Sequence, residues 1–289
     1  MKIYIDGELL EREDARISVF DHGLLYGDGV FEGIRVYDRR VFRLDAHLAR
    51  LYASAQAIGL AIPLVPTAMA EAVRDTVRAN RQEQGYIRLV VTRGDGPLGL
   101  DPTTCPRPRV IIIVADVVVY PRELYDAGVR VITAATRQVP AACVDPRIKS
   151  LNDLKNVLAR LEAHAAGAAE ALMLNADGFV AECTADNVFA VRGTRVLTPP
   201  ASEGALDGIT RAVVRELAIA DGLEWCETRL ARYDLFVADE CFLSGTGAEL
   251  VPMVALDGRR IGSGAPGPIT RRFTASLRAL AAREGTPTF

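Results

Sequence analysis

The chain has 289 residues, of which 49% are hydrophobic and 25% are charged, and its formal net charge is −3. These proportions are ordinary for a soluble globular protein, and the length suffices for two modest domains or one large one. Because the net charge is so small, it gives no reason to expect nucleic acid or an anionic membrane as a partner.

The first part of the chain, residues 1–119, is predicted to form a small N-terminal α/β domain. Apolar residues spaced by three and four predict a helix over 44–58, and a second helix is expected over 66–80. The run 109–120 is almost continuously apolar and predicts a buried strand. The other expected strands are Lys2–Ile5, Glu8–Leu10, Gly29–Tyr37, Arg40–Phe42 and Tyr86–Thr92.

Residues 120–128 are predicted to be an interdomain linker, and residues 129–289 a larger C-terminal domain. Helices are expected over 151–166, from Ile209 onward and over 269–283. The expected strands are Val129–Ala134, Ala171–Leu174, Phe179–Glu182, Val188–Val191, Arg195–Leu197, Glu224–Arg229 and Glu240–Ser244. This order of elements indicates an α+β fold rather than a strict βαβ alternation.

Several kinds of site lack the residues they need. The five cysteines are scattered and form no CxxC pair, so neither disulfides nor a zinc site is expected. The three histidines form no HExxH motif, and no GxSxG elbow is present. The first residues, MKIYIDGELLERED, carry acids where a signal peptide needs an apolar stretch, and the run 110–120 is too short to span a bilayer. We therefore expect a cytoplasmic protein without a metal centre.

Two GxGxxG matches are better interpreted as loops than as dinucleotide-binding turns. The match at 94–99 contains Pro97 and is followed by Leu100-Asp101-Pro102, so no helix opens there. The match at 262–267 lies too near the C-terminus for the acidic residue that would bind a ribose. A nicotinamide-dependent enzyme is therefore a poor second hypothesis.

Lysine usage directs attention to one residue. Of 34 basic residues only three are lysines, namely Lys2, Lys149 and Lys155. Lys149 stands between a predicted strand and an amphipathic helix, where a side chain can project into a cleft. Taken alone, it would more often be an ordinary surface lysine. Unlike arginine, however, a lysine can form a Schiff base.

Later segments supply the other groups that pyridoxal phosphate requires. The cofactor needs an acid beside its pyridine nitrogen and donors for its phosphate. Glu182 ends a predicted strand and can be that acid, although a solvated carboxylate is as common at such a position. Gly208-Ile209-Thr210 opens a helix, where free N–H groups suit a phosphate, unless Thr210 only caps the helix. Ser244-Gly-Thr246-Gly247 adds small residues and hydroxyls.

In this order the motifs resemble those of the fold-type IV (class IV) pyridoxal-phosphate aminotransferases, most closely the branched-chain aminotransferases. The resemblance covers almost the whole chain. The motifs that carry it are Phe20–Arg35, Leu44–Leu51, Tyr86–Arg88, Ile148–Asn152, Ala181-Glu182, Gly208–Arg211 and Ser244–Glu249. It implies a two-domain, D-amino acid aminotransferase-like fold, in which the larger, cofactor-binding domain has a β-barrel-like core.

The resemblance also implies a role for each matching residue. Lys149 corresponds to the catalytic Schiff-base lysine and Glu182 to the partner of the pyridine nitrogen. The positions that match cofactor phosphate ligands are Arg50, Ile209, Thr210 and Thr246. The positions that match substrate-binding residues are Tyr26, Phe31, Tyr86, Arg88, Thr246 and Gly247. Tyr86 and Arg88, two apart on one strand, are expected on the same face.

The activity implied is ping-pong transamination between the branched-chain L-amino acids leucine, isoleucine or valine and 2-oxoglutarate, through pyridoxamine phosphate. The family also implies a homodimer or a larger even assembly, in which the loop 94–102 reaches the neighbouring subunit. The expected partners are thus small amino and 2-oxo acids and a second copy of the chain.

Two other activities of the same family remain alternatives. D-amino-acid aminotransferases carry an arginine and a histidine in the loop after the Tyr86 strand, where this chain has Leu98 and Leu100. Aminodeoxychorismate lyase resembles the chain at Glu182-Cys183 but not at Tyr86–Arg88. The chain also departs from the branched-chain pattern, because Asp153 stands where close relatives have a tyrosine near the cofactor's phenolic oxygen. Gly247 replaces a more usual alanine.

Overall fold

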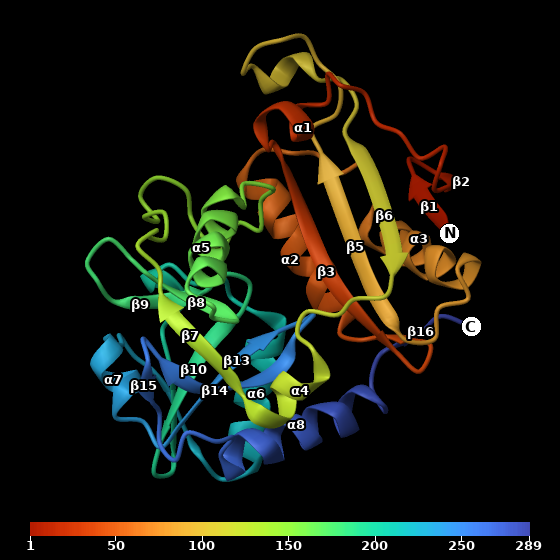
Figure 1. The fold of residues 1–289 in the computed structure, drawn as a ribbon. Helices are drawn as coiled ribbons and strands as arrows, with labels where there is room; N and C mark the ends of the chain where they lie inside the picture. The colour runs from red at the N-terminus through yellow and green to blue at the C-terminus, as the bar shows by residue number, and fades with distance from the viewer. The chain divides into compact units, whose positions relative to one another are not determined.

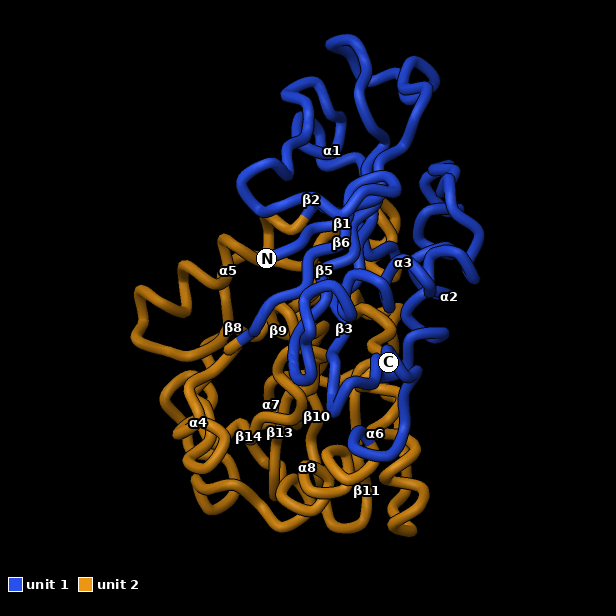
Figure 2. Tube along the Cα trace, turned by 90° about the vertical axis from the view of Figure 1, so that its right-hand side faces the viewer, with its two compact units in different colours: residues 1–117, 148–152, 281–289 blue, residues 118–147, 153–280 orange.

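The computed structural model describes all residues from Met1 to Phe289. The chain divides into two compact units, coloured separately in Figure 2. Unit 1 contains residues 1–117, 148–152 and 281–289, and unit 2 contains residues 118–147 and 153–280. The expected division at 119–129 differs from this one, because two short later segments join unit 1 through backbone pairing. The expected linker 120–128 also contains a helix, α4 (Arg122–Ala127).

Unit 1 is built on a seven-stranded antiparallel sheet, whose central strands run side by side in Figure 1. The strands, in sheet order, are β16 (Thr286–Pro287), β4 (Arg40–Val41), β3 (Gly29–Tyr37), β5 (Gly85–Thr92), β6 (Arg109–Ala115), β1 (Lys2–Ile5) and β2 (Glu8–Glu11). Alternate residues of β5 and β6 are buried, as expected for strands with one face on a core.

Two helices cover that sheet and close the core of unit 1. Helix α2 (Leu44–Ala57) contacts β3, and helix α3 (Pro66–Ala79) contacts β1 and β6. Their buried residues recur every three or four positions and pack against the sheet, with Leu51 and Val73 fully buried. A short third helix, α1 (His22–Tyr26), precedes β3 and was not predicted.

One predicted strand is too long. The apolar run 109–120 forms a strand only as far as Ala115. The reason is the register, which pairs Ala115 with Tyr86 at the start of β5, so that the residues beyond have almost no neighbouring strand to bond. The chain instead passes into unit 2, where Tyr120 is buried in a different core.

Unit 2 contains a mixed nine-stranded sheet. Its main path runs through β12 (Glu224–Glu227), β11 (Arg195–Thr198), β10 (Asn187–Arg192), β13 (Glu240–Gly245), β14 (Glu249–Leu256), β7 (Val129–Thr133), β8 (Glu170–Leu174) and β9 (Val180–Cys183), and β15 (Arg259–Arg260) pairs with β14. Strand β14 was not predicted; it contains Pro252, a residue that is rare inside a central strand. It nevertheless pairs with β13 on one side and β7 on the other.

Five α-helices belong to unit 2, and aromatic rings stack in its core. The helices are α4, α5 (Leu154–Ala165), α6 (Ile209–Ala220), α7 (Arg232–Phe236) and α8 (Pro268–Ala281). Phe189 and Phe242 stack with 4.7 Å between ring centroids, and Phe273 of α8 meets Phe242 edge-on. The expected α+β class is confirmed. None of the helices combines the length and the apolar character needed to cross a membrane.

Candidate active site

Lys149 is fixed to unit 1 by its own backbone. Its carbonyl accepts a hydrogen bond from Phe31 N at 3.0 Å, its N–H donates to Ser54 Oγ at 3.1 Å, and Leu151 N donates to Gly29 O at 3.0 Å. The segment 148–152 therefore extends the sheet beside the start of β3. Lys149 Nζ lies 4.3 Å from the ring centroid of Phe31. The backbone pairing thus sets the direction of a half-buried lysine side chain.

Three predicted substrate residues gather near that lysine. Arg88 Cζ lies 4.5 Å from the ring centroid of Phe31 and 5.7 Å from that of Tyr86. Tyr86 and Arg88 share a face of β5, as a spacing of two requires. A Cβ atom on Gly33 would lie 1.8 Å from Tyr86 Oη, so only glycine lets this ring cross β3. Burial raises the pKa of the Tyr86 hydroxyl.

Arg50, a predicted phosphate ligand, makes a two-pronged ion pair with Glu32 of β3. The distances are 2.7 Å from Nε to Oε1 and 2.8 Å from Nη2 to Oε2. His47, one turn earlier on α2, lies 2.7 Å from Glu32 Oε2 through Nδ1. Glu32 is fully buried. Burial alone would raise its pKa, but the hydrogen bonds from Arg50 and His47 outweigh burial and lower the pKa to about 2. Burial lowers the pKa of His47.

This cluster was missed at the sequence level. The sequence indicated only that His47 and Arg50 stand three residues apart on a predicted helix, and that a predicted strand carries the acid Glu32. Arg50 is therefore oriented by a buried carboxylate and not by a ligand alone.

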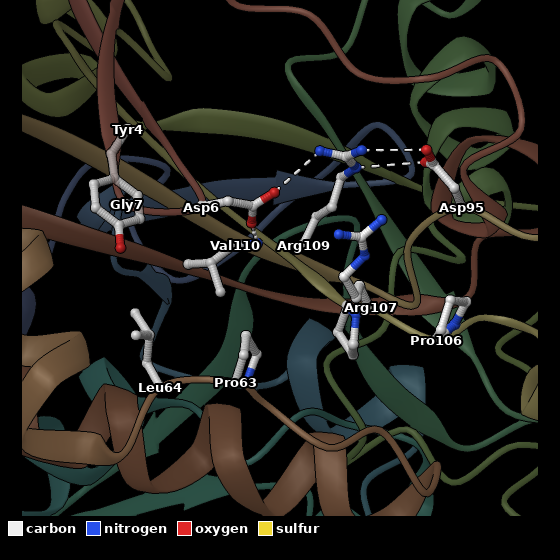
Figure 3. Close-up of a pocket in the computed structure, with 11 residues that line it drawn as sticks. Tyr4, Asp6, Gly7, Pro63, Leu64, Asp95, Pro106, Arg107, Arg109 and Val110 are labelled. Carbon is white, nitrogen blue, oxygen red and sulfur yellow. Dashed lines mark hydrogen bonds and ion pairs between the residues drawn. The ribbon is translucent and has the colours of Figure 1, made fainter.

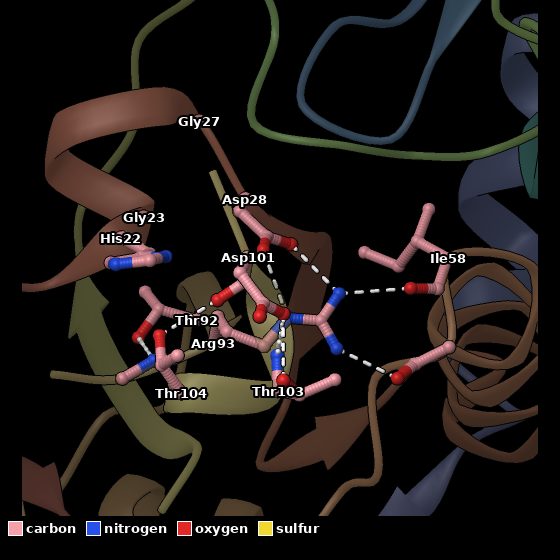
Figure 4. A network of polar contacts seen from close by, with 12 residues as sticks. His22, Gly23, Gly27, Asp28, Ile58, Thr92, Arg93, Asp101, Thr103 and Thr104 are labelled. Carbon is pink, nitrogen blue, oxygen red and sulfur yellow. Dashed lines mark hydrogen bonds and ion pairs between the residues drawn. The ribbon is translucent and has the colours of Figure 1, made fainter. Parts of the chain in front are cut away.

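Tyr26 lies on α1, which a polar network ties to the sheet (Figure 4). Asp21 caps α1 by accepting from Gly23 N at 2.7 Å, and its second oxygen accepts from the Thr92 hydroxyl at 2.8 Å. The Tyr26 hydroxyl accepts from Gly99 N at 3.0 Å. Asn152 Nδ2 donates to Gly27 O at 3.0 Å, which joins the end of α1 to the Lys149 segment.

Arg93 completes this network. Its guanidinium pairs with Asp28 at 2.9 and 3.0 Å and donates to the carbonyls of Ile58 and Gly59 at 2.8 and 2.7 Å. Because Asp28 directly follows the end of α1 and the two carbonyls follow α2, one buried arginine fixes both helices to the end of β5. Tyr26 is thereby attached to the same frame as Lys149.

Glu182 of β9 is held in unit 2 by three neutral donors. Gln138 Nε2 donates to Oε1 at 3.0 Å, and Leu206 N and Asn187 Nδ2 donate to Oε2 at 2.9 and 3.3 Å. Gln138 is buried and also bonds Gly204 O at 2.7 Å. Neither Gln138 nor Asn187 was predicted, since their positions depend on strand pairing. The donors fix a carboxylate in one orientation.

The predicted phosphate segment forms the start of helix α6. Gly208 is its N-cap, and no side chain caps the free N–H groups at Ile209 and Thr210. A Cβ atom on Gly208 would lie 2.1 Å from Asn187 Oδ1, so this close approach requires glycine. An uncapped helix start favours an anion through its N–H groups and its dipole.

A second loop of unit 2 follows β13. Thr246 and Gly247 come directly after this strand, and the Ser244 hydroxyl is buried without a hydrogen-bond partner. Such an orphaned hydroxyl is rare unless a ligand or water completes it. Together with the uncapped start of α6 and the oriented Glu182, it fits the phosphate and pyridine ends of pyridoxal phosphate.

Asp153, the residue that replaces a tyrosine of the family pattern, immediately precedes α5. Its Oδ1 accepts from Asn156 Nδ2 at 3.0 Å. The carboxylate is therefore engaged at the first turn of its own helix.

A separate cavity of about 570 Å³ lies in unit 1 (Figure 3). Its lining includes Tyr4, Leu64 and Val110, and none of the predicted site residues. Arg109 at its wall is neutralised by Asp6 at 3.0 Å and Asp95 at 3.2 Å. The cavity therefore gives no reason to move the candidate site.

Comparison with known proteins identifies the class. The family model described as Amino-transferase class IV matches residues 29–256, and the chain belongs to this family. A putative branched-chain-amino-acid aminotransferase of Methanocaldococcus jannaschii is 46% identical, over 99% of this chain and 98% of that protein. A D-alanine aminotransferase of Bacillus licheniformis is 35% identical, over 96% of each. The crystal structure of the Escherichia coli branched-chain amino acid aminotransferase covers 98% of this chain and 95% of its own, with a TM-score of 0.95 and 33% identity.

These findings confirm three predictions. The fold is that of the fold-type IV aminotransferases, the protein is an aminotransferase, and the cofactor of its class is pyridoxal 5′-phosphate. The roles of the individual residues remain proposals.

Proposed function

We propose that this protein transfers the amino group of leucine, isoleucine or valine to 2-oxoglutarate in a ping-pong reaction that uses pyridoxal phosphate. The observation that carries the proposal is the position of Lys149, whose Nζ lies on the ring of Phe31 at 4.3 Å. It puts the one lysine suited to hold the cofactor against an apolar wall. The similarity to named branched-chain aminotransferases supports the same substrate class.

The residues divide the chemistry among them. Bound pyridoxal phosphate supplies an electron sink for the pair released when the Cα–H bond of an amino acid breaks. Lys149 would hold the cofactor in the resting enzyme and, as a neutral amine, would accept the Cα proton of the amino acid. Glu182, oriented by Gln138 and Asn187, would accept a hydrogen bond from the protonated pyridine nitrogen. These two residues set the electron flow.

Other residues bind the two ends of the cofactor and the substrate. Ile209, Thr210 and Thr246 would offer N–H and hydroxyl donors to the phosphate, and Arg50, oriented by Glu32, would be its cation. The substrate α-carboxylate binds at Thr246 and Gly247. The remaining substrate residues, Tyr26, Phe31, Tyr86 and Arg88, form a wall that is apolar but carries hydroxyl and guanidinium donors. Such a wall accepts an aliphatic side chain in one half-reaction and a second carboxylate in the other.

A D-amino-acid aminotransferase is the second candidate, favoured by the 35% identity to a D-alanine aminotransferase. Leu98 and Leu100 argue against it, since an aliphatic loop offers no side-chain donor for a carboxylate.

The same two leucines are strongly exposed, 73% and 80%. Phe20 and Leu24, which are close to Tyr26 in the sequence, are exposed as well. We propose that this apolar surface is buried in a homodimer, which light scattering of the purified protein tests by mass.

The deciding experiment is the absorption spectrum of the purified protein with pyridoxal phosphate, before and after addition of L-leucine or D-alanine. We expect a lysine-bound cofactor band that L-leucine bleaches and D-alanine does not. Bleaching by D-alanine alone would move the substrate assignment to D-amino acids. Lys149→Ala should abolish the band, whereas Lys2→Ala, a matched surface substitution in the same unit, should keep it. A band that survives in Lys149→Ala contradicts the proposed role of Lys149.

A further inference from the structure

A buried cluster in unit 2 holds two carboxylates on one phenol. The Tyr120 hydroxyl lies 2.9 Å from Glu170 Oε2 and 2.9 Å from Asp186 Oδ2. All three side chains are almost completely buried, with exposed fractions of 3%, 1% and 3% for Tyr120, Glu170 and Asp186. The contacts of this buried hydroxyl therefore depend on how many protons the phenol and the two carboxylates carry.

The phenol has one hydrogen and can donate it to only one carboxylate. Burial raises the pKa of Tyr120, so the phenol keeps this hydrogen. If both carboxylates were ionised, the oxygen of Tyr120 would face one of them at 2.9 Å without a hydrogen between them, which is strongly unfavourable in a buried site. One carboxylate must therefore carry a proton of its own.

The donors around Glu170 show that it is the ionised partner. Its Oε1 accepts from the Thr184 hydroxyl at 2.6 Å and from Ala171 N at 2.7 Å. Its Oε2 accepts from the guanidinium of Arg160 on α5. This carboxylate is surrounded by donors and paired with a cation, so the hydrogen of Tyr120 completes its shell.

Asp186 has the opposite surroundings. It has no ion pair with an arginine or lysine, and its side chain bonds the hydroxyl of Tyr120. The charged and titratable groups that face it are Glu170 on β8, Glu182 and Cys183 on β9, and Arg160 on α5. Burial, followed by the charge of Glu170, raises the pKa of Asp186 to about 7. The proton that the geometry requires therefore sits on Asp186.

Asp186 lies where it touches two parts of the candidate site. Its carbonyl accepts from Cys183 N at 2.8 Å, which closes the turn between β9 and β10. Glu182 directly precedes this turn, and Asn187, which bonds Glu182, directly follows it. On the other side, a Cβ atom on Gly245 would lie 2.0 Å from Asp186 Oδ1, so the carboxyl packs on the backbone just before Thr246.

We infer that Asp186 is a neutral carboxylic acid which donates its proton to Tyr120, and that this acid is a positioning residue for Glu182 and for the Gly245–Thr246 backbone. The positioning role rests on the proposed function of Glu182, whereas the protonation does not. When Asp186 ionises, a second buried negative charge appears beside the turn that carries Glu182. The environment of the pyridine nitrogen then changes with the titration of a residue that does not touch the cofactor.

The protonation is tested by infrared spectroscopy of the holoenzyme against pH. Wild type and the control Asp177→Asn, an exposed acid in the turn before β9, should show the carbonyl band of a buried carboxylic acid at pH 5.5 or so, and this band should fade as Asp186 titrates. Asp186→Asn, which keeps a donor toward Tyr120, should lack the band at every pH. A wild-type protein without the band, or an Asp186→Asn protein that keeps it, overturns the inference.

The positioning is tested by the absorption of bound pyridoxal phosphate in the same samples. Wild type and Asp177→Asn should show a spectral step that coincides with the loss of the infrared band, and Asp186→Asn should lose this step. Asp186→Leu, which removes the donor, should bind the cofactor more weakly than Asp186→Asn. A step that persists in Asp186→Asn overturns the positioning role. A wild-type protein that binds no cofactor instead overturns the proposed function, and the positioning role with it, while the infrared result still decides the protonation.

Discussion

Each unit of the molecule buries acids beside an arginine, with opposite results. In unit 1 one carboxylate, Glu32, meets the guanidinium of Arg50 along both of its oxygens, and its pKa falls to about 2. In unit 2 Arg160 pairs with Glu170 only, and the pKa of Asp186, which has no ion pair, rises to about 7. The carboxylates are almost completely buried in both clusters. The ratio of carboxylates to cations therefore decides which acid is ionised.

The two clusters consequently respond to pH in opposite directions. The pKa of Glu32 is lower in the folded than in the unfolded protein, so its contribution to stability is full above about pH 4.5 and is lost as the pH falls toward 2. The pKa of Asp186 is raised from 3.8, so its contribution is full below about pH 4 and is lost as the pH rises toward 7. The contributions of Glu32 and Asp186 to stability are therefore both nearly complete only between about pH 4 and 5.

The largest effect is expected from removal of the cation in unit 1. Arg50→Met leaves Glu32 buried without its guanidinium, which should lower the free energy of unfolding by about 3–5 kcal/mol. Urea unfolding of the cofactor-free protein at pH 7 measures it. The double variant Glu32→Gln with Arg50→Met is the control, because it removes the stranded charge and should recover much of the loss. Equal losses in the single and double variants would show that the charge is not the cause.

The next effect concerns acid unfolding. In wild type the contribution of Glu32 should be lost between pH 4.5 and 2, which for a pKa shift of this size corresponds to about 3 kcal/mol. Glu32→Gln cannot titrate, so its free energy of unfolding should fall less over that range. Unfolding curves at pH 5 and pH 2.5 for both proteins give the difference. If both proteins lost the same free energy of unfolding between pH 5 and pH 2.5, other carboxylates would be responsible for the acid sensitivity.

How much of these clusters the sequence predicts depends on how local their contacts are. The strand Gly29–Tyr37 was predicted with its observed bounds, because its pattern lies within nine residues. Lys149, Glu182 and the Gly208–Thr210 segment were recognised from short motifs. The partners of Glu182 and of Arg50 were not. Glu32 lies 18 residues from Arg50, and Leu206 and Gln138 lie 24 and 44 residues from Glu182; Asn187 is only 5 residues from Glu182 but reaches it across the turn between β9 and β10.

The cluster of unit 2 was missed for the same reason and for one more. Tyr120 was assigned to the end of the predicted strand 109–120, where the predicted linker begins, since its neighbours Val117–Val119 are apolar. In the structure it bonds residues 50 and 66 positions further on. A continuous apolar run shows that a segment is buried but not in which core, so the sequence could not reveal that this hydroxyl joins two acids.

A moderate effect is expected when the shared hydroxyl is removed. Tyr120→Phe keeps the ring in the core but leaves Glu170 and Asp186 each without one buried hydrogen bond. The free energy of unfolding should fall by about 1–3 kcal/mol. Urea unfolding at pH 5.5 and pH 8 measures it, and Tyr233→Phe, on a mostly exposed tyrosine of α7, is the control. If Tyr120→Phe behaves like Tyr233→Phe, the hydroxyl does not bridge the two acids.

The smallest effect is expected from removal of the cation in unit 2, and it distinguishes the two clusters most directly. Arg160 is 43% exposed, whereas Arg50 is 13% exposed, so water already screens its pairing with Glu170. Without Arg160, moreover, the Thr184 hydroxyl, the backbone N–H and Tyr120 still donate to Glu170. Arg160→Met should therefore lower the free energy of unfolding by only about 1 kcal/mol at pH 5.5.

This loss of stability should grow as the pH rises, because Asp186 then ionises beside a carboxylate that has no cation. Urea unfolding of Arg160→Met and Arg50→Met at both pH values measures the contrast. Equal losses in the two variants would mean that a bridging proton does not replace a cation in unit 2.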